Sequence, residues 1–156
     1  MNYDIHVKQV PPLVVATERQ HTALAELGKV MQSTLTEIAS SVHPPSAATG
    51  APFAIYYNEP FTPDDIDVEM GMPITGSAEV EPSSKVQRRE LPGGAVAFTV
   101  HSGPYEAIGA AYNALYAWVK VHGHRPLGPP REIYLVGPGP DREPASYRTE
   151  IDVPID

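Results

Sequence analysis

The stretch VEMGMPI at residues 68–74 returns at residues 149–155 as TEIDVPI, with its glutamate, proline and isoleucine in the same places. The two stretches are 81 positions apart, about half the length of the chain. Two further pairs of segments repeat at nearly this spacing: Val10-Pro11 and Leu91-Pro92 at 81 positions, and IYY from Ile55 and IYL from Ile133 at 78 positions. Three matched pairs at nearly one spacing indicate an internal duplication.

Both halves show the same order of predicted elements, namely two strands, a helix and two strands. The first half gives strands at 4–10 and 13–18, a helix at 22–41, and strands at 54–59 and 66–72. The second half gives strands at 85–91 and 95–101, a helix at 104–122, and strands at 132–136 and 147–153. Apolar residues at steps of three and four predict the amphipathic helices, and alternation predicts the strands. Short turns between neighbouring strands favour antiparallel pairing.

We therefore predict an α+β fold in which duplicated ββαββ units form a mainly antiparallel eight-stranded sheet with two long helices and a central pocket. A chain of 156 residues has the size of one domain. We expect a single domain over 1–156, made of a first pseudo-repeat (1–74), a linker (75–84) and a second pseudo-repeat (85–156). The pocket is expected because duplicated units bury their apolar faces against each other, and binding sites favour such interfaces.

The composition narrows the classes of partner. The chain has 19 acidic and 11 basic residues, a formal charge of −8, and no cysteine. An acidic surface repels phosphate groups, which weighs against nucleic acid and anionic membranes, and it mildly favours cationic ligands. The lack of cysteine excludes disulfides, thiolate catalysis and cysteine metal sites. Because the N-terminus lacks an apolar signal segment and no run is long enough to span a membrane, we expect a soluble, cytoplasmic protein.

Glu132 stands at the head of the apolar run EIYLV, whereas Ala54 takes this place in the first half. Strand alternation puts Glu132 and Tyr134 on one face, and Ala54 and Tyr56 on the corresponding face. A carboxylate in apolar surroundings is costly unless a cation or hydrogen bonds compensate it, and such a group is a candidate for function. The alternative is a strand-end carboxylate in water.

The second predicted helix is rich in rings. Tyr105, Tyr112 and Tyr116 lie along one edge of its apolar stripe, and Trp118 lies along the other edge. Buried rings of these types need hydrogen-bond partners for their polar tips. The rings either bridge core and solvent at the flank of the helix, or at least two of them line a pocket.

The residues as a whole resemble the GyrI-like small-molecule-binding domain family. The segments that carry the resemblance are HSGPYEAIGAAYNALYAWVKVHG (101–123), GPPREIYLVGP (128–138), YRTEIDVPI (147–155), PFAIYYNEP (52–60) and DVEMGMPI (67–74). The resemblance covers essentially the whole chain. It implies two related units around a ligand pocket, as in the effector-binding halves of multidrug-sensing regulators of the MerR and AraC types.

The resemblance also implies a set of site residues. In this family an acidic residue at the EIY position lies under aromatic rings and receives lipophilic cations, which corresponds to Glu132. By similarity, the ring contributors are Tyr134, Tyr105 and Tyr112, and Trp118 and Tyr56 are further candidates. Met70 or Met72 would add a flexible apolar side chain to the wall of the pocket.

Three functions stay open at this point. The first is a binding protein for lipophilic, often cationic or aromatic compounds, in sequestration, sensing or resistance. The second is a hydrolase of cyclopropane-bearing alkylating natural products, with Glu132 as general acid or base and Tyr112 orienting the substrate or donating a proton. The third is an inhibitor of a partner protein such as DNA gyrase.

The remaining expectations concern partners and cofactors. Both predicted helices belong to the repeat, so we expect a stand-alone member without a DNA-binding segment and without direct contact to nucleic acid. A protein partner or a homodimer stays open. No cofactor is expected, and no metal either, because His122 and His124 lack a third ligand at suitable spacing.

Overall fold

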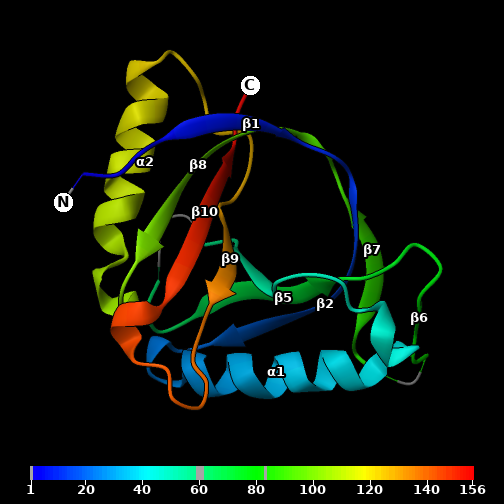
Figure 1. Ribbon diagram of the computed structural model, residues 1–156. Helices are drawn as coiled ribbons and strands as arrows, with labels where there is room; N and C mark the ends of the chain where they lie inside the picture. Colours follow the sequence, from blue (N-terminus) through cyan, green and yellow to red (C-terminus); the bar gives the residue numbers. More distant parts are fainter. Residues whose placement is uncertain (1, 59–61, 83) are drawn as a thin grey trace. The chain divides into compact units, whose positions relative to one another are not determined.

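The computed structural model describes residues 2–58, 62–82 and 84–156 and divides the chain into two compact units. Unit 1 joins the N-terminal segment, residues 1–11, to residues 93–156. Unit 2 comprises residues 12–92. The elements of both units can be followed in Figure 1.

Unit 1 is a four-stranded antiparallel sheet with one long helix. Its strands are β1 (His6–Val10), β8 (Gly94–Ser102), β9 (Arg131–Val136) and β10 (Arg148–Pro154), and its long helix is α2 (Gly109–Val121). Short 3₁₀ turns, η3 (Tyr105–Ala107) and η4 (Pro144–Ser146), precede α2 and β10. The strand order is β1-β8-β10-β9, with β8 pairing with both β1 and β10.

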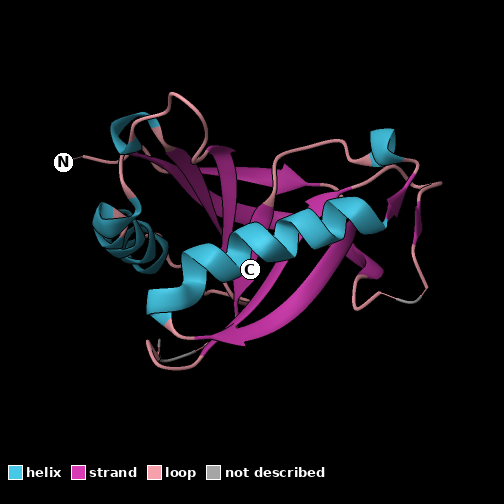
Figure 2. Cartoon of the chain, turned by 90° about the horizontal axis from the view of Figure 1, so that it is seen from below, coloured by secondary structure: helices cyan, strands magenta, loops and turns pink. Residues whose placement is uncertain are grey.

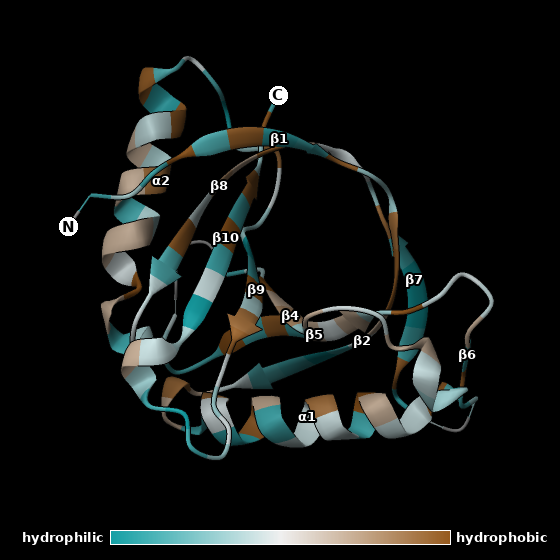
Figure 3. Cartoon of the chain, in the orientation of Figure 1, coloured by the Kyte–Doolittle hydropathy of each residue, from teal (hydrophilic) through white to brown (hydrophobic). Residues whose placement is uncertain are grey.

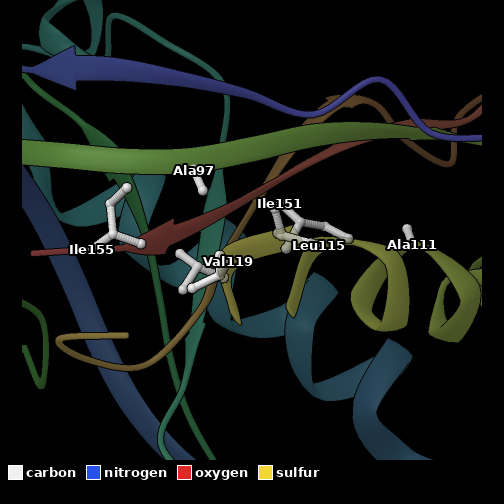
Figure 4. Close-up of a cluster of buried hydrophobic side chains, with 7 residues drawn as sticks. Ala97, Ala111, Leu115, Val119, Ile151 and Ile155 are labelled. Atoms are coloured by element: carbon white, nitrogen blue, oxygen red, sulfur yellow. The ribbon is translucent and has the colours of Figure 1, made fainter. Parts of the chain in front are cut away.

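The core of unit 1 lies between α2 and the sheet. The helix contributes Ala111, Leu115 and Val119, which are four residues apart and therefore lie on one face of the helix. Figure 4 shows Leu115 beside Ile151, which faces the helix from β10. Burying a side chain of this size contributes about 1.5–3 kcal/mol, so this contact helps to hold the helix on this face of the sheet.

Unit 2 has the same order of elements. Its strands are β2 (Leu13–Thr22), β4 (Phe53–Tyr56), β5 (Ile66–Pro73) and β7 (Gln87–Leu91), in the order β7-β2-β5-β4. The 3₁₀ turn η1 (Leu24–Glu26) leads into the long helix α1 (Leu27–Ser41), which packs on β2 and β5. A short ladder of β3 (Val42–His43) and β6 (Glu79–Val80), and the turn η2 (Pro45–Ala47), complete the unit.

The two long helices have the expected amphipathic character. Figure 2 shows α1 and α2 as unbroken spirals, and Figure 3 shows hydrophobic and hydrophilic residues alternating along each of them. The α+β class, the antiparallel pairing, the two long helices and four main strands in each unit confirm the predicted fold class. None of the helices in the described ranges is both long enough and apolar enough to cross a membrane.

The strand registers of the two units agree under the sequence shift of 81 positions. Lys8 lies opposite Val96, as Arg89 lies opposite Val15, and Ile151 lies opposite Thr99, as Met70 lies opposite Glu18. The ion pairs repeat as well: Lys8 Nζ is 2.8 Å from Glu150 Oε2, and Arg89 Nη2 is 2.7 Å from Glu69 Oε1. These repeats are what the duplication hypothesis predicts.

The first strand of each half pairs differently from our expectation. The short turns at Pro11-Pro12 and at residues 92–94 favoured pairing between the strands on either side of each turn, but β1 pairs with β8 and β7 pairs with β2. Two-residue hairpin loops need positive φ angles, and proline fixes φ near −65°. The proline connections therefore carry the chain from one unit into the other. The predicted strand 54–59 appears as Phe53–Tyr56, and its last residue, 59, lies outside the described ranges.

Candidate functional site

Glu132 is the second residue of β9 and lies on the face of the sheet that α2 covers. It pairs with Ile151 of β10, and directly paired residues project to the same side of a sheet. Ile151 belongs to the core under α2, so the Glu132 side chain points to that core as well. Glu132 is only 8% exposed, which rules out the alternative of a carboxylate in water.

Two tyrosine hydroxyls donate hydrogen bonds to the Glu132 carboxylate. The Tyr134 hydroxyl donates to Oε1 at 2.9 Å, and the Tyr112 hydroxyl donates to Oε2. Tyr134 stands two residues further along the same strand, so alternation places it on the same face. Tyr112 reaches the carboxylate from α2. Each carboxylate oxygen thus has a neutral donor.

The electrostatics of Glu132 are dominated by its burial. Burial raises the pKa of Glu132 above its usual value, while the hydrogen bonds from Tyr112 and Tyr134 and the influence of His101 lower it, and the net direction is upward. Among the described residues no lysine or arginine forms an ion pair with Glu132. Its charge is therefore solvated by phenols but not neutralised.

Further rings lie around this carboxylate. Tyr105 meets Tyr134 edge to face, with ring centroids 6.0 Å apart at 84°, and lies 5.2 Å from the Tyr147 ring. Tyr112 stacks on Tyr116 at 6.4 Å. Burial, with smaller contributions from Tyr147 and Glu132, raises the pKa of Tyr105 to about 12. The Tyr105 phenol therefore stays neutral at physiological pH, and the rings of the cluster offer aromatic faces and edges.

His101 and Thr149 extend the polar part of the site, and the sequence reasoning missed both. His101 is fully buried, with Nδ1 3.0 Å from the Tyr3 hydroxyl and Nε2 3.0 Å from the Pro104 carbonyl oxygen. A carbonyl only accepts, so Nε2 carries a proton, and the neutral ring satisfies both contacts. Thr149 lies opposite His101 and Tyr134, and its buried hydroxyl has no partner in the described part of the chain.

The other predicted site residues lie apart from this cluster or in unit 2. Trp118 stacks on His122 at 3.9 Å and lies 6.0 Å from His124, at the C-terminal end of α2. Tyr56 is half-buried in β4, and Met72 is buried in β5. A role in ligand binding stays a prediction for all three.

The Glu132 site offers no metal centre by its composition, since it holds a single carboxylate and a histidine committed to other partners. A group of three or more histidine, aspartate or glutamate side chains suited to a metal ion does not occur within the described ranges. Chemically, the cluster can bind a positive charge, hold a proton on a carboxyl group, and stack aromatic rings.

The profile of the GyrI-like small molecule binding domain matches residues 3–156. A comparison with curated protein sequences gives no match. Because the match covers nearly the whole chain, the protein belongs to the GyrI-like small-molecule-binding domain family.

Solved structures show the same fold. The C-terminal domain of EcmrR has a TM-score of 0.86 at 22% identity, covering 100% of this chain and 99% of that domain. Against EcmrR in its complex with DNA, the TM-score is 0.87 at 21% identity, and the match covers 99% of this chain but 57% of EcmrR.

Two more distant structures are also similar. A hydrolase from Listeria innocua has a TM-score of 0.71 at 12% identity, covering 97% of this chain and 91% of the hydrolase. SAV2435, solved with bound tetraphenylphosphonium, has a TM-score of 0.60 at 14% identity, covering 100% of this chain and 94% of SAV2435. At these identities the likeness concerns the fold.

Proposed function

We propose that the protein binds lipophilic, cationic, aromatic small molecules, with Glu132 as the counter-charge. One observation carries the proposal: Glu132 is buried, accepts hydrogen bonds from two neutral tyrosines, and has no cationic partner among the described residues. A buried carboxylate without a counter-charge is costly to the folded protein. A ligand that brings a positive charge offsets this cost.

The rings around Glu132 favour a lipophilic cation over a small hydrated one. A desolvated cation over an aromatic face gains about 2 kcal/mol, and a delocalised charge loses little hydration on entering an apolar site. Tyr105, Tyr134 and Tyr112 supply the rings. When a ligand cation replaces their hydroxyls at the Glu132 carboxylate, Tyr112 and Tyr134 would turn these hydroxyls, or the edges of their rings, to make room for it.

The family and one structural relative agree with this class of ligand. The family is described by its binding of small molecules, and SAV2435 was solved with tetraphenylphosphonium, an aromatic lipophilic cation. Sequestration, sensing and resistance are the roles that such binding serves. The choice among them depends on partners beyond the residues of this site.

The test compares two ions of the same shape and opposite charge. Wild-type protein should bind tetraphenylphosphonium and should not bind tetraphenylborate, as measured by calorimetry at pH 8. Glu132→Gln keeps the size of the side chain and removes the charge, so it should weaken cation binding at least about tenfold. Glu106→Gln changes an exposed glutamate of η3 and should leave binding unchanged. Equal binding by wild type and Glu132→Gln would refute the proposal.

Hydrolysis is the second candidate, favoured by the raised pKa of Glu132 and its hydrogen bond with Tyr112. A carboxyl group that holds its proton closer to neutral pH is suited to general acid–base catalysis. The fold likeness to the Listeria innocua hydrolase agrees with this candidate. Incubation with a cyclopropane-bearing alkylator should then give a water adduct by mass spectrometry with wild type but not with Glu132→Gln. Unchanged alkylator with wild type would exclude this substrate class.

A further inference from the structure

Four residues at the Glu132 site are more polar than their counterparts in unit 2. Three of these pairs stand 81 positions apart, and the pair that includes Glu132 stands 78 positions apart. The pairs are Tyr105 and Leu24, Tyr112 and Met31, Thr149 and Val68, and Glu132 and Ala54. The Tyr112 hydroxyl donates to Glu132, so the polar groups of these two residues satisfy each other. The hydroxyl of Thr149 is not accounted for in this way.

Thr149 in β10 and Val68 in β5 occupy the same place in their sheets. Thr149 lies opposite His101 of β8 and Tyr134 of β9. Val68 lies opposite the counterparts of these two residues in β2 and β4. Both side chains are fully buried, at 0% exposure. Because valine and threonine have nearly the same shape, unit 2 shows that this position can be filled without a hydroxyl.

The Thr149 hydroxyl has no hydrogen-bond partner among the residues that the structure describes. Its two neighbours across the strands use their polar atoms elsewhere. Both ring nitrogens of His101 contact other residues, and the Tyr134 hydroxyl donates to Glu132. A buried donor without an acceptor destabilises a folded protein, and such donors are rare in native structures. Since valine would avoid this cost, the hydroxyl calls for an acceptor that a ligand brings.

Thr149 projects from the same face of the sheet as Glu132. Ile151, two residues further along β10, lies opposite Glu132, and Figure 4 shows Ile151 beside Leu115 of α2. Strand alternation puts Thr149 on this face as well. Glu132 and Thr149 are therefore diagonal neighbours on adjacent strands, which places their Cα atoms about 7–8 Å apart. A small ligand can span this separation with two groups that lie a few bonds apart.

We infer that Thr149 is a second recognition residue of the Glu132 site, and that its hydroxyl donates to an oxygen which the ligand carries a few bonds from its positive charge. This inference rests on the proposed function, because the charge has to be bound at Glu132. It narrows the ligand class from lipophilic aromatic cations to those with a hydroxyl, ether or carbonyl oxygen near the charge. Tetraphenylphosphonium meets only the first of these two requirements.

Two triphenylphosphonium ions of matched size separate the effect of the oxygen from that of the charge. The 2-hydroxyethyl ion ends in a hydroxyl group, and the propyl ion has a methyl group in its place. Calorimetry at pH 8 gives the ratio of their affinities for each protein variant. This ratio should favour the hydroxyethyl ion at least about threefold more in wild type than in Thr149→Val. Thr149→Ser keeps the hydroxyl and should keep the wild-type ratio.

Val68→Thr is the matched control, because it adds a hydroxyl at the counterpart position of unit 2. It should leave the ratio of affinities unchanged. In the free protein, Thr149→Val removes an unpaired hydroxyl and should not lower the urea midpoint of unfolding, whereas Val68→Thr buries a hydroxyl and should lower it. A lower midpoint for Thr149→Val would show that its hydroxyl is already satisfied in the free protein, which would overturn the inference.

Tetraphenylphosphonium, which has no oxygen, distinguishes a failure of this inference from a failure of the proposed function. Its affinity should be the same in wild type and Thr149→Val, and it should fall in Glu132→Gln. The inference alone is overturned if tetraphenylphosphonium binding depends on Glu132 while the hydroxyethyl-to-propyl ratio is the same in wild type and Thr149→Val. If no phosphonium ion binds in a way that depends on Glu132, the proposed function and the inference both fail.

Discussion

Glu132 in unit 1 and Glu69 in unit 2 are both buried glutamates that accept a hydrogen bond from a tyrosine, yet they differ in one respect. Glu69 also receives two hydrogen bonds from Arg89, each 2.7 Å long, whereas Glu132 has only phenols. Burial by itself raises the pKa of both groups. For Glu69 the hydrogen bonds and the charge of Arg89 reverse this, so its pKa lies below the usual value, while that of Glu132 lies above it.

The comparison shows which glutamate is structural. The Glu69–Arg89 pair has a counterpart in Glu150–Lys8, at the same shift of 81 positions, so both units contain this ion pair. Glu132 has no such counterpart, because Ala54 occupies the matching position. We therefore assign the charge that both units neutralise internally to the architecture, and our proposal assigns the charge without a counter-ion, Glu132, to ligand binding.

The largest effect on stability is expected from removing the cation of the structural pair. Arg89→Met leaves Glu69 buried without its counter-charge and should lower the free energy of unfolding by about 2 kcal/mol. Fully buried pairs lose about 3–5 kcal/mol, and Arg89 is 38% exposed, which reduces the effect. Urea unfolding at pH 7 measures it. Adding Glu69→Gln should recover part of the loss, and an unchanged midpoint in Arg89→Met would mean that the pair is not structural.

A smaller effect of the opposite sign is expected at Glu132. Glu132→Gln removes an uncompensated buried charge and keeps an acceptor for one tyrosine, so it should raise the free energy of unfolding by about 1 kcal/mol at pH 8. Glu69→Gln, the matched change, should lower it because Arg89 loses its partner. If both substitutions destabilise the protein equally, the charge of Glu132 is compensated in the folded protein as that of Glu69 is, and the distinction between them is wrong.

The two glutamates should also respond to pH in opposite directions. The pKa of Glu132 is raised on folding, so its contribution to stability is present below pH 4.5, the ordinary glutamate value, and is lost as pH rises through the folded value. The pKa of Glu69 is lowered, so its contribution is present above pH 4.5 and is lost as pH falls. The gain from Glu132→Gln should therefore grow between pH 4.5 and 8. A gain that shrinks over this range would contradict the assigned direction.

The smallest effect concerns one phenol. Tyr134→Phe removes the donor to Glu132 Oε1 and should lower the free energy of unfolding by about 1 kcal/mol or less at pH 8. In the Glu132→Gln background the same change should lower the free energy of unfolding by less, because a hydrogen bond from the hydroxyl stabilises an uncharged amide less than a carboxylate. A double-mutant cycle by urea unfolding checks this, and equal costs in both backgrounds would show that the hydroxyl does not stabilise the charge.

Strand alternation was sufficient to predict part of the site. Alternation along EIYLV correctly placed Glu132 and Tyr134 on one face. Tyr112 does lie on the predicted ring-rich helix, from which it reaches Glu132. The pairing of β1 with β8 could not be predicted in the same way, because alternation defines the faces of a strand but not its neighbour. The spacing of 81 between Lys8 and Arg89, and between Glu150 and Glu69, was visible in the sequence and would have indicated the repeated ion pair.

Contacts that depend on long-range packing lay beyond the sequence. His101 and Tyr3 are 98 positions apart, and the unpartnered hydroxyl of Thr149 is recognisable only once its neighbours on β8 and β9 are known. Glu18 likewise appeared to be an ordinary residue of a predicted strand. Its burial results from the packing of α1 on β2 and β5, a long-range contact that local propensity does not indicate.

The most direct test of the central claim is the affinity for tetraphenylphosphonium as a function of pH, for wild type and Glu132→Gln. If an ionised, uncompensated Glu132 receives the cation, wild-type affinity should rise about tenfold per pH unit below the folded pKa of Glu132 and level off above it, with protons released on binding. Glu132→Gln should bind weakly with no such dependence. A wild-type affinity independent of pH and equal to that of Glu132→Gln would show that the carboxylate is not the counter-charge.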